Sequence, residues 1–307
     1  MSHQTHRRAG SLLFQVNQLF AAGHAIGASK HQAKRRGEAV GRVFAVRTDW
    51  NYRDGTLASA RWARERHGCH VVAEAVRHPE WGGEWTAELL ARGKATSTVK
   101  GYLSGVAKAC AIVAPELRPA WTAVVAAAGT RTPPPPRGFG EDAERLILDV
   151  RQHAPEAGLV LDLILATGAR IGELVPTRRA GDHHLVADRL LGADQILLVG
   201  KGGLERIRSL PPALYAELAE RAEALADEAP VFAVTDRDVQ RALRQACARL
   251  GIAGERKGPH GLRYDYATRG RARRLDEGLD EEAADRAVSR ELGHRRPAIT
   301  HHYLRTR

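Results

Sequence analysis

The 307-residue sequence contains few aromatic residues, few cysteines and no long apolar run. Aromatic residues make up 5% of the chain, which argues against binding single-stranded nucleic acid by stacking many bases. The cysteines at 69, 110 and 247 lie far apart and form no CxxC pair, which argues against a disulfide framework or a zinc site. No uninterrupted apolar stretch approaches the ~20 residues that a membrane span needs, and polar residues break the amino-terminal segment that a signal peptide requires. We therefore expect a soluble cytoplasmic protein without a membrane-spanning segment.

Acidic residues are also in deficit. There are 47 Lys and Arg residues against 36 Asp and Glu, which gives a net charge of +11. This balance excludes an acidic disordered chain and favours a polyanionic partner, nucleic acid first and a membrane surface second. With 43% hydrophobic residues the chain can bury a sizeable core, and at roughly 150 residues per domain its length predicts two domains.

A proline run divides the sequence. Four consecutive prolines within GTRTPPPPRG cannot continue a helix and predict a stiff, extended connector. We therefore expect a basic helical domain at 1–130, a linker at 131–138 and a second domain at 139–307. Residues 1–138 contain 20 basic and 9 acidic residues, whereas the remainder contains 27 of each. Solvated helix faces are the ordinary interpretation of such charge, but an excess confined to one part favours a module that grips a polyanion.

Helical spacing dominates the first part. Leu12, Val16 and Phe20 recur on one face, and a helix capped by Thr96 or Ser97 is expected to run to Cys110. Further helices are predicted over 56–76 and 119–128, and no strand is predicted before the prolines. Three lysines on or near the polar side of the 96–110 helix are the DNA-binding candidates: Lys94, Lys100 and Lys108.

The second part combines helices with a short hairpin. β-runs at 195–199 and 206–210 flank Gly-Lys-Gly-Gly, whose glycines can supply the positive φ values of a tight turn. An apolar segment spans 159–166, and helices are predicted at 141–150, 211–226, 236–250, 260–273, 281–292 and 297–304. The fold class expected is mainly α with a small antiparallel hairpin or sheet.

Several polar residues of this part could act on a phosphate, although each has an ordinary interpretation. Arg170 opens a helical segment after Thr-Gly, and such an arginine is usually a surface residue. Lys201, on the glycine-rich turn, could approach a phosphate or donate a proton, but isolated turn lysines are usually solvated. The turn is not a P-loop, because its glycine spacing is wrong and a strand follows it. His260 and Arg263 share a helix face near a helix start, where an anion is favoured, although a capping histidine beside a surface arginine would look alike.

The carboxyl-terminal motif adds two more candidates. His294 lies in Leu-Gly-His, and Tyr303 lies near the end of a helix expected to begin at Pro297. Alone, such a tyrosine would be a packing or surface residue. The pair His301–His302 does not indicate a metal site, because adjacent helix side chains point apart and no matching ligand cluster exists elsewhere.

Taken in order, these residues resemble the tyrosine recombinase (phage integrase) family. The resemblance is carried by Arg170, Lys201, His260, Arg263, His294 and Tyr303, within ATGARIGEL, GKGGLERIRSLP, HGLRYDYAT and LGHRRPAITHHY. It covers about residues 139–307, whereas the first part is similar to the family's helical core-binding domain mainly in layout and in ATSTVKGYLSGV. The implied fold is therefore a helical core-binding domain followed by a mixed α/β catalytic domain. Tyr264 stands where many relatives carry a second histidine.

The resemblance implies a mechanism. Tyr303 would attack a scissile DNA phosphate to give a 3′-phosphotyrosyl enzyme and a free 5′-hydroxyl, without metal, ATP or another cofactor. Arg170 and Arg263 would clamp the non-bridging oxygens with help from His294. Lys201 would protonate the departing 5′-oxygen, and His260 would assist proton transfer at the nucleophile.

The resemblance also implies partners and context. We expect an integrase of a mobile element or phage that acts on double-stranded DNA as a homo-tetramer on two sites. Possible further partners are accessory DNA-bending or directionality proteins, whereas no membrane partner is expected. In a prokaryote, the protein would associate with the nucleoid. Because the chain stops soon after Tyr303, protomers are expected to make contact other than through a long tail. No arm-binding domain is expected before the first helix. The charged stretch 269–285 is expected to be a solvated helix pair, and the alternative is a regulatory or interface role.

Two alternatives remain at this stage. A type IB topoisomerase or a resolvase of dimers or hairpin ends would use the same chemistry, although the motif order around Leu-Gly-His and the short length favour a recombinase. A DNA-binding regulator that has lost catalysis is a different class of protein, and the complete set of six polar residues argues against it.

Overall fold

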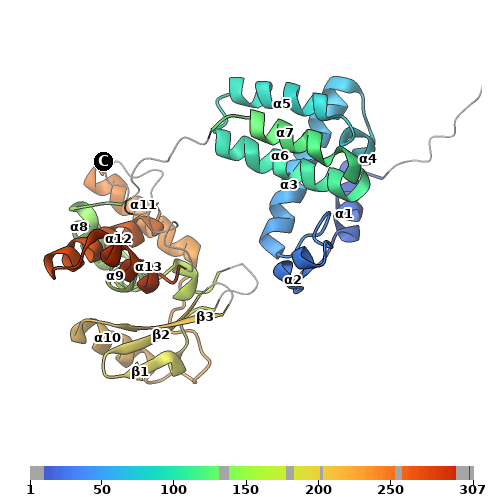
Figure 1. Cartoon of the computed structure of the whole chain (residues 1–307). Helices are drawn as coiled ribbons and strands as arrows, with labels where there is room; N and C mark the ends of the chain where they lie inside the picture. The colour runs from blue at the N-terminus through green and yellow to red at the C-terminus, as the bar shows by residue number, and fades with distance from the viewer. Residues whose placement is uncertain are drawn as a thin grey trace, which may run out of the picture. The chain divides into compact units, whose positions relative to one another are not determined.

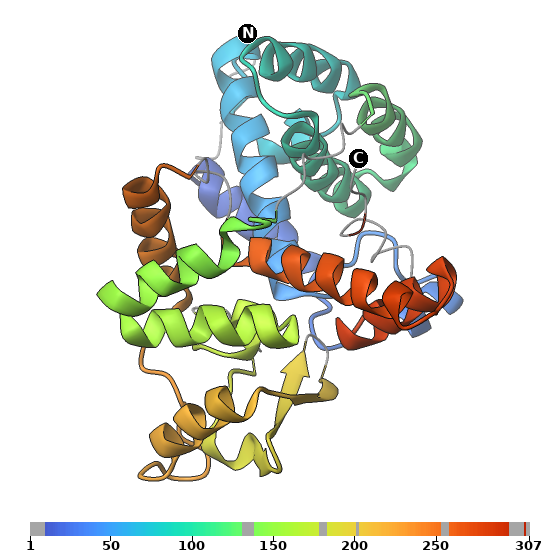
Figure 2. The same ribbon diagram turned by 90° about the vertical axis from the view of Figure 1, so that its left-hand side faces the viewer.

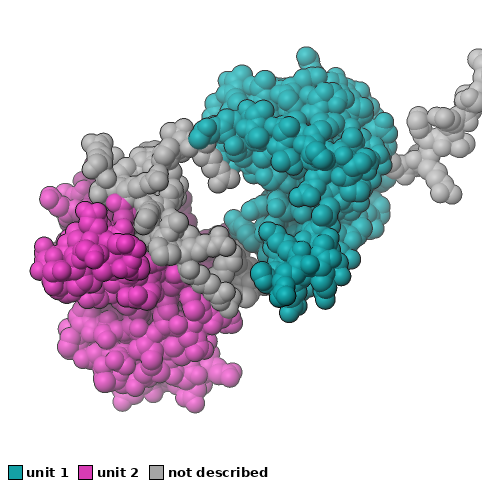
Figure 3. All heavy atoms as spheres, viewed as in Figure 1, with its two compact units in different colours: residues 1–133 teal, residues 134–307 magenta. Residues whose placement is uncertain are grey.

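The computed structural model describes residues 10–130, 138–177, 183–200, 203–252, 258–294 and 304. The chain divides into two compact units, Met1–Pro133 and Pro134–Arg307 (Figure 3). Each unit has its own apolar core. In the described residues, no helix is long and apolar enough to cross a membrane.

The first unit is built from helices around one core (Figure 1). Its elements are α1 (Leu12–Ala22), α2 (Lys30–Arg35), α3 (Val46–His67), α4 (Val72–Ala75), α5 (Pro79–Ala91), α6 (Thr96–Val113), the 3-10 turn η1 (Pro115–Leu117) and α7 (Arg118–Ala127). Helices α3 and α6 pack closely because glycines line their contact. A Cβ at Gly105 would lie 2.6 Å from the carbonyl oxygen of Tyr52, so a larger residue would force the helices apart.

The helices predicted in the first unit are partly right. Those near Leu12, from Thr96 and over 119–128 are confirmed, whereas α2 and α5 were not predicted. The single helix predicted over 56–76 is wrong: α3 begins earlier and ends at His67, because Gly68 follows in the left-handed region at φ 67°. The short helix α4 is separate from it. Within residues 10–130 there is no strand, only an isolated bridge between His24 and Val43.

The second unit combines helices with a small sheet. Its elements are α8 (Asp142–His153), α9 (Pro155–Thr167), the 3-10 turns η2 (Ile171–Glu173) and η3 (Ala187–Arg189), β1 (Leu190–Gly192), β2 (Gln195–Gly200), β3 (Leu204–Ser209), α10 (Pro212–Ala222), α11 (Asp236–Leu250), α12 (His260–Asp276) and α13 (Glu281–Glu291). The strands form an antiparallel sheet in the order β1-β2-β3. The predicted mainly α fold with an antiparallel hairpin is confirmed, and β1 extends the hairpin to a sheet. The helix predicted over 297–304 lies outside the described residues, apart from Leu304.

Packing in the second unit places α9 at its centre. Almost every apolar side chain of α9 is buried, and α8, α11 and α12 contact it while α13 packs on α12. The three strands and α10 lie together on one side of these packed helices (Figures 1 and 2). The segment that follows the proline run is fixed to α12, because the buried carboxylate of Asp265 accepts hydrogen bonds from the backbone N–H groups of Phe139 (2.8 Å) and Gly140 (2.9 Å). The end of α9, the start of α12 and the end of α13 meet, because Arg263 donates to the carbonyl oxygens of Gly168 and Leu292. Gly200, the last residue of β2, lies against the nearby side chain of Glu173.

Candidate functional site

The turn after α9 places Arg170. The helix ends where Gly168 adopts φ 65°, and a side chain there would lie 2.5 Å from a ring atom of Tyr266. The hydroxyl of Thr167 accepts a hydrogen bond from the N–H of Ala169 at 3.2 Å, which satisfies one backbone group of this sharp turn. Thr-Gly-Ala-Arg is therefore a compact helix exit that delivers Arg170 to the start of η2.

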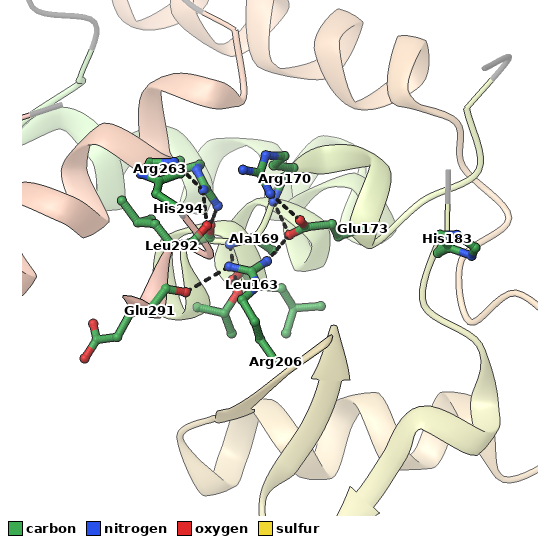
Figure 4. A network of polar contacts seen from close by, with 12 residues as sticks. Leu163, Ala169, Arg170, Glu173, His183, Arg206, Arg263, Glu291, Leu292 and His294 are labelled. Atoms are coloured by element: carbon green, nitrogen blue, oxygen red, sulfur yellow. Dashed lines mark hydrogen bonds and ion pairs between the residues drawn. The ribbon is translucent and has the colours of Figure 1, made fainter. Parts of the chain in front are cut away.

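A buried carboxylate orients Arg170. Glu173, only 3% exposed, accepts a hydrogen bond from the backbone N–H of Arg170 at 2.8 Å and another from its Nη1 at 2.7 Å. The same carboxylate also accepts from Nη2 of Arg206, which is 9% exposed and donates from Nη1 to the carbonyl oxygen of Glu291 at 2.8 Å (Figure 4). Glu173 thus joins η2 to β3, and Arg206 joins β3 to the end of α13.

Arg206 was not predicted as a site residue. Burial and the charges of Arg170 and Arg208 lower its pKa, and Glu173 opposes that shift. The sequence held one signal for it, because alternation along β3 places Arg206 and Arg208 on one face and Ile207 on the other. The structure turns the arginine face inward and leaves Ile207 57% exposed. A strand that turns its arginines inward and its isoleucine outward is typical of a polar site instead of an apolar core.

Arg263 is fully buried on the face of α12 that meets α9. Its Nη1 donates to the carbonyl oxygen of Gly168, and its Nη2 donates to that of Leu292 at 2.5 Å. Nη2 also lies 3.2 Å from Nε2 of His294. Carbonyl oxygens at the ends of two different helices therefore fix this guanidinium, and its packing sets its orientation before any ligand binds.

The end of α13 explains the Leu-Gly-His sequence. The N–H of His294 bonds to the carbonyl oxygen of Ser289 at 2.9 Å, and the N–H of Gly293 bonds to that of Arg290 at 2.9 Å. This is a Schellman end, which requires a residue in the left-handed region, and Gly293 has φ 67°. A Cβ at Gly293 would also lie 2.8 Å from Cδ of Arg206. The glycine therefore both turns the chain and lets the arginine pass.

His294 is neutral at neutral pH. Burial first, and then the positive charges of Arg263, Arg170, Arg206 and His260, lower the pKa of His294 from 6.5 to about 4. Because a guanidinium can only donate, Nε2 is the accepting nitrogen toward Arg263 and the ring proton lies on Nδ1. The site therefore contains an uncharged imidazole surrounded by cations.

His260 is the exposed first residue of α12. Its ring packs edge-on against Tyr264, with ring centroids 5.6 Å apart. It lies near enough to His294 for its charge to lower the pKa of that histidine. The structure thus brings together four of the six predicted site residues: Arg170, His260, Arg263 and His294.

The other two predicted residues, Lys201 and Tyr303, lie outside the described residues. Gly200 and Gly203, on either side of the 201–202 turn, show where the turn begins. The N–H of Gly203 bonds to the carbonyl oxygen of Gly200 at 3.0 Å, and a Cβ at Gly200 would lie 2.8 Å from a carboxylate oxygen of Glu173. The hairpin tip therefore begins directly against the carboxylate that orients Arg170. Leu304 packs on the apolar cluster formed by α12 and α13.

A second polar network braces these elements. The buried hydroxyl of Tyr266 donates to Glu291 at 2.6 Å and accepts from Arg208, and Arg274 donates to the other Glu291 oxygen at 2.5 Å. Burial raises the pKa of Tyr266 above its ordinary value. Burial alone would raise the pKa of Glu291 too, but the hydrogen bonds from Tyr266 and Arg274 outweigh it and lower that pKa. The network joins β3, α12 and α13.

In the first unit, the three candidate lysines lie on or beside α6. Lys94 precedes the helix and is exposed, whereas Lys100 and Lys108 lie on it and are partly buried. Across the part of the chain that the structure describes, no group of three or more His, Cys, Asp or Glu side chains could hold a metal ion.

No protein-family model matches the chain, and no curated protein matches it. Solved structures do. The Tn1549 transposon integrase in complex with transposon right end DNA is 14% identical, with a TM-score of 0.60 over 95% of this chain and 95% of that one. The XerH site-specific recombinase bound to a palindromic difH substrate is 15% identical, with a TM-score of 0.57 over 96% and 92%. A lambda integrase (75–356) dimer bound to a COC′ core site is 15% identical, with a TM-score of 0.56 over 90% and 93%.

These proteins are tyrosine recombinases. The chain described here therefore has the tyrosine recombinase fold, as the sequence resemblance predicts.

Proposed function

We propose that this chain is a site-specific DNA recombinase or integrase that cuts and rejoins duplex DNA through Tyr303. The observation that carries the proposal is the convergence of Arg170 and Arg263 on one site around the neutral His294. Two fixed guanidinium groups beside an uncharged imidazole form an arrangement suited to a phosphodiester.

The chemistry follows from the charges. The Tyr303 oxygen would attack the scissile phosphorus, form a tyrosine–phosphorus bond and break the bond to the 5′-oxygen of the next nucleotide. Negative charge grows on the non-bridging oxygens, where Arg170 and Arg263 would clamp it with a hydrogen bond from His294. Lys201 would give its proton to the departing 5′-oxygen, and His260 would assist removal of the tyrosine proton. Attack by a 5′-hydroxyl of the partner strand would reverse these bond changes and release Tyr303. The 3′-phosphotyrosyl link conserves the phosphodiester energy, so the step needs neither ATP nor a metal.

The comparisons support DNA as the substrate. The Tn1549 integrase, XerH and lambda integrase structures contain DNA, and the XerH structure is a post-cleavage complex. The basic first unit would grip the duplex as a core-binding domain, with the proline run as the linker to the catalytic domain. Lys94, Lys100 and Lys108 would contribute to that grip. The active assembly would be a homo-tetramer on two DNA sites, as expected of an integrase from a mobile element.

Covalent trapping tests the proposal. Purified protein is mixed with a pool of nicked duplexes, including DNA from its own genomic neighbourhood, and the products are resolved on denaturing gels. We expect a protease-sensitive protein–DNA adduct that is lost in Tyr303→Phe. The matched control is Tyr215→Phe, because Tyr215 lies on α10 and, within the described residues, its hydroxyl only accepts a hydrogen bond from the N–H of Gly192. This control should still form the adduct.

The products also separate the alternatives. Joining of strands between two DNA molecules supports a recombinase, whereas changes in linking number alone would indicate a topoisomerase. If wild type and Tyr303→Phe bind DNA equally and neither forms an adduct on genomic-neighbourhood DNA, the proposal is refuted in favour of a DNA-binding regulator.

A further inference from the structure

The first unit contains a pocket of about 380 Å³ between α2, the start of α3, α6 and the start of α7. The loop that joins α2 to α3 forms one of its walls. Among the described residues that line the pocket, none carries a carboxylate. Five of them are cationic, and they are called the pocket cations below: Lys30, Lys34, Arg42, Lys108 and Arg118.

The pocket cations have no carboxylate partner among the residues that the structure describes. None forms an ion pair with a carboxylate in the described part of the chain, whereas elsewhere in this unit Arg53 pairs with Asp49 at 2.6 Å, and Arg92 pairs with Glu88. Glu38 lies on the pocket loop but pairs with Arg36 at 3.1 Å, and neither residue lines the pocket. Positive charge is therefore concentrated in this pocket, and no described carboxylate pairs with it.

The pocket wall is held in place by backbone contacts. The N–H of Ala25 bonds to the carbonyl oxygen of Val43 and the N–H of Val43 bonds to that of Gly23, both at 2.9 Å, so the two ends of the loop segment are tied together. Gly41 lies in the left-handed region at φ 70°, and a Cβ there would lie 2.9 Å from the carbonyl oxygen of Ala111 on α6. The loop thus packs directly on α6, and the cationic side chains extend from a fixed frame.

Lys108 shows the cost of this arrangement. It lies partly buried on α6, and burial together with the charges of Lys30 and Arg118 lowers its pKa. A lysine that is desolvated among like charges destabilises the unliganded fold. A bound anion would offset that cost, and the hydroxyl-bearing residues Thr48 and Tyr52 also line the pocket and could donate to anionic oxygens.

We propose that this pocket is a phosphate-binding site. Its charge and lining suit a group that presents several anionic oxygens, and two sources share that chemistry: a phosphate of the DNA backbone, or the phosphate of a free small molecule. The DNA source rests on the proposed function, whereas phosphate recognition by the pocket does not.

The first arm of the test uses inorganic phosphate at constant ionic strength. All five tryptophans lie between positions 50 and 121, so the tryptophan fluorescence of the full chain reports on this unit alone. A ligand that binds the folded form raises its Tm by mass action. We expect phosphate to raise the Tm of wild type and of Arg36→Gln, which removes one positive charge from the same loop outside the pocket. Lys34→Gln/Lys108→Met should lose that rise.

The variants also separate binding from folding. Lys34 is exposed, so Lys34→Gln alone cannot disturb the core and should weaken the phosphate response by itself. Lys108→Met keeps most of the buried stem and removes the repelled charge, so it should have a higher Tm than wild type without phosphate. A residue needed only for packing would show neither effect.

The second arm uses random-sequence duplex DNA. If the pocket holds one backbone phosphate, the slope of log Kd against log salt concentration should be smaller in magnitude by about 1 in the double variant than in wild type, at ~0.9 per phosphate contact. An unchanged slope with a lost phosphate response would assign the pocket to a free phosphate-bearing molecule. If both responses in the double variant match those of Arg36→Gln, the proposal is overturned. The covalent adduct tests the proposed function separately, because neither arm of this experiment requires catalysis. A missing adduct would therefore count against the proposed function and not against the phosphate site.

Discussion

Replacing Glu173 by Gln should destabilise the second unit and disable the site together. The carboxylate is 3% exposed and is shared by Arg170 and Arg206. Glutamine keeps the size of the side chain but removes its charge, and its amide would point one donor at groups that can only donate. Arg206, 9% exposed, would remain buried with its charge uncompensated.

The magnitude follows from that burial. Removing one partner of a buried ion pair typically costs about 3–5 kcal/mol, whereas replacing both partners by apolar groups is often close to neutral. Glu173→Gln should therefore lower the free energy of unfolding by about 3 kcal/mol. The double variant Glu173→Gln/Arg206→Met should be more stable than Glu173→Gln alone, with a coupling energy of about 2 kcal/mol. The exposed pair Arg286–Glu282 on α13 is the matched control and should couple by about 0.5 kcal/mol or less.

The assay must separate the two units. Because every tryptophan lies in the first unit, tryptophan fluorescence should give the same urea midpoint for every variant. Amide hydrogen exchange in α9 and α12 reports on the second unit and should carry the whole difference. Formation of the covalent adduct should also slow about a hundredfold in Glu173→Gln, because Arg170 loses the group that orients it. Additive effects of Glu173→Gln and Arg206→Met on stability would refute the shared-carboxylate interpretation.

Two further predictions concern other parts of the site. The folded pKa of His294, about 4, lies below its ordinary value of 6.5, so the free energy of unfolding should fall as the pH drops from about 6.5 toward 4. The loss should be at most about 3 kcal/mol, reduced by solvent screening, and His294→Gln should flatten the pH profile of amide exchange in this window. Asp265→Asn can accept only one of two backbone hydrogen bonds, so it should cost about 2 kcal/mol and speed amide exchange at Phe139 and Gly140. Unchanged exchange at those two amides would contradict the anchoring role.

The elements that were predicted correctly have a clear local signal in the sequence. The hairpin was predictable because glycines flank its turn, and α6 was predictable because its apolar spacing is regular. Helix α3 was misplaced because its polar first turns carry little periodic signal, and its end depends on the left-handed Gly68. Strand β1 is only three residues long and exists through its pairing with β2, which no local pattern contains.

The site residues differ in how visible they are. Arg170, Arg263 and His294 stand in motifs whose order carries the family resemblance. Arg206 also stands in a quoted motif, GKGGLERIRSLP, but its place there assigns it no role, and its contact with Glu173 appears only when the sheet forms. Likewise, the pocket cations are scattered between residues 30 and 118, and only the folding of the loop onto α6 brings them together. Sequence order thus reveals the chemistry, whereas long-range packing determines which other charges support it.

The charges of the site explain why Arg206 is needed. Glu173 orients Arg170, but as a lone carboxylate it would also cancel the charge that Arg170 offers to a phosphate. Arg206 balances that carboxylate from the buried side. With Arg263 held by neutral carbonyl oxygens and His294 uncharged, these five groups carry a net charge of about +2 at neutral pH, from the ordinary charges of their types and the lowered pKa of His294. A phosphodiester carries one negative charge and gains a second as a nucleophile adds. Under the proposed function, these five groups therefore match the charge of the phosphate in the transition state better than that of the bound substrate, which is the condition for catalysis instead of tight binding. Lys201 and His260 are outside this sum, because their proposed task is to move protons at the two reacting oxygens.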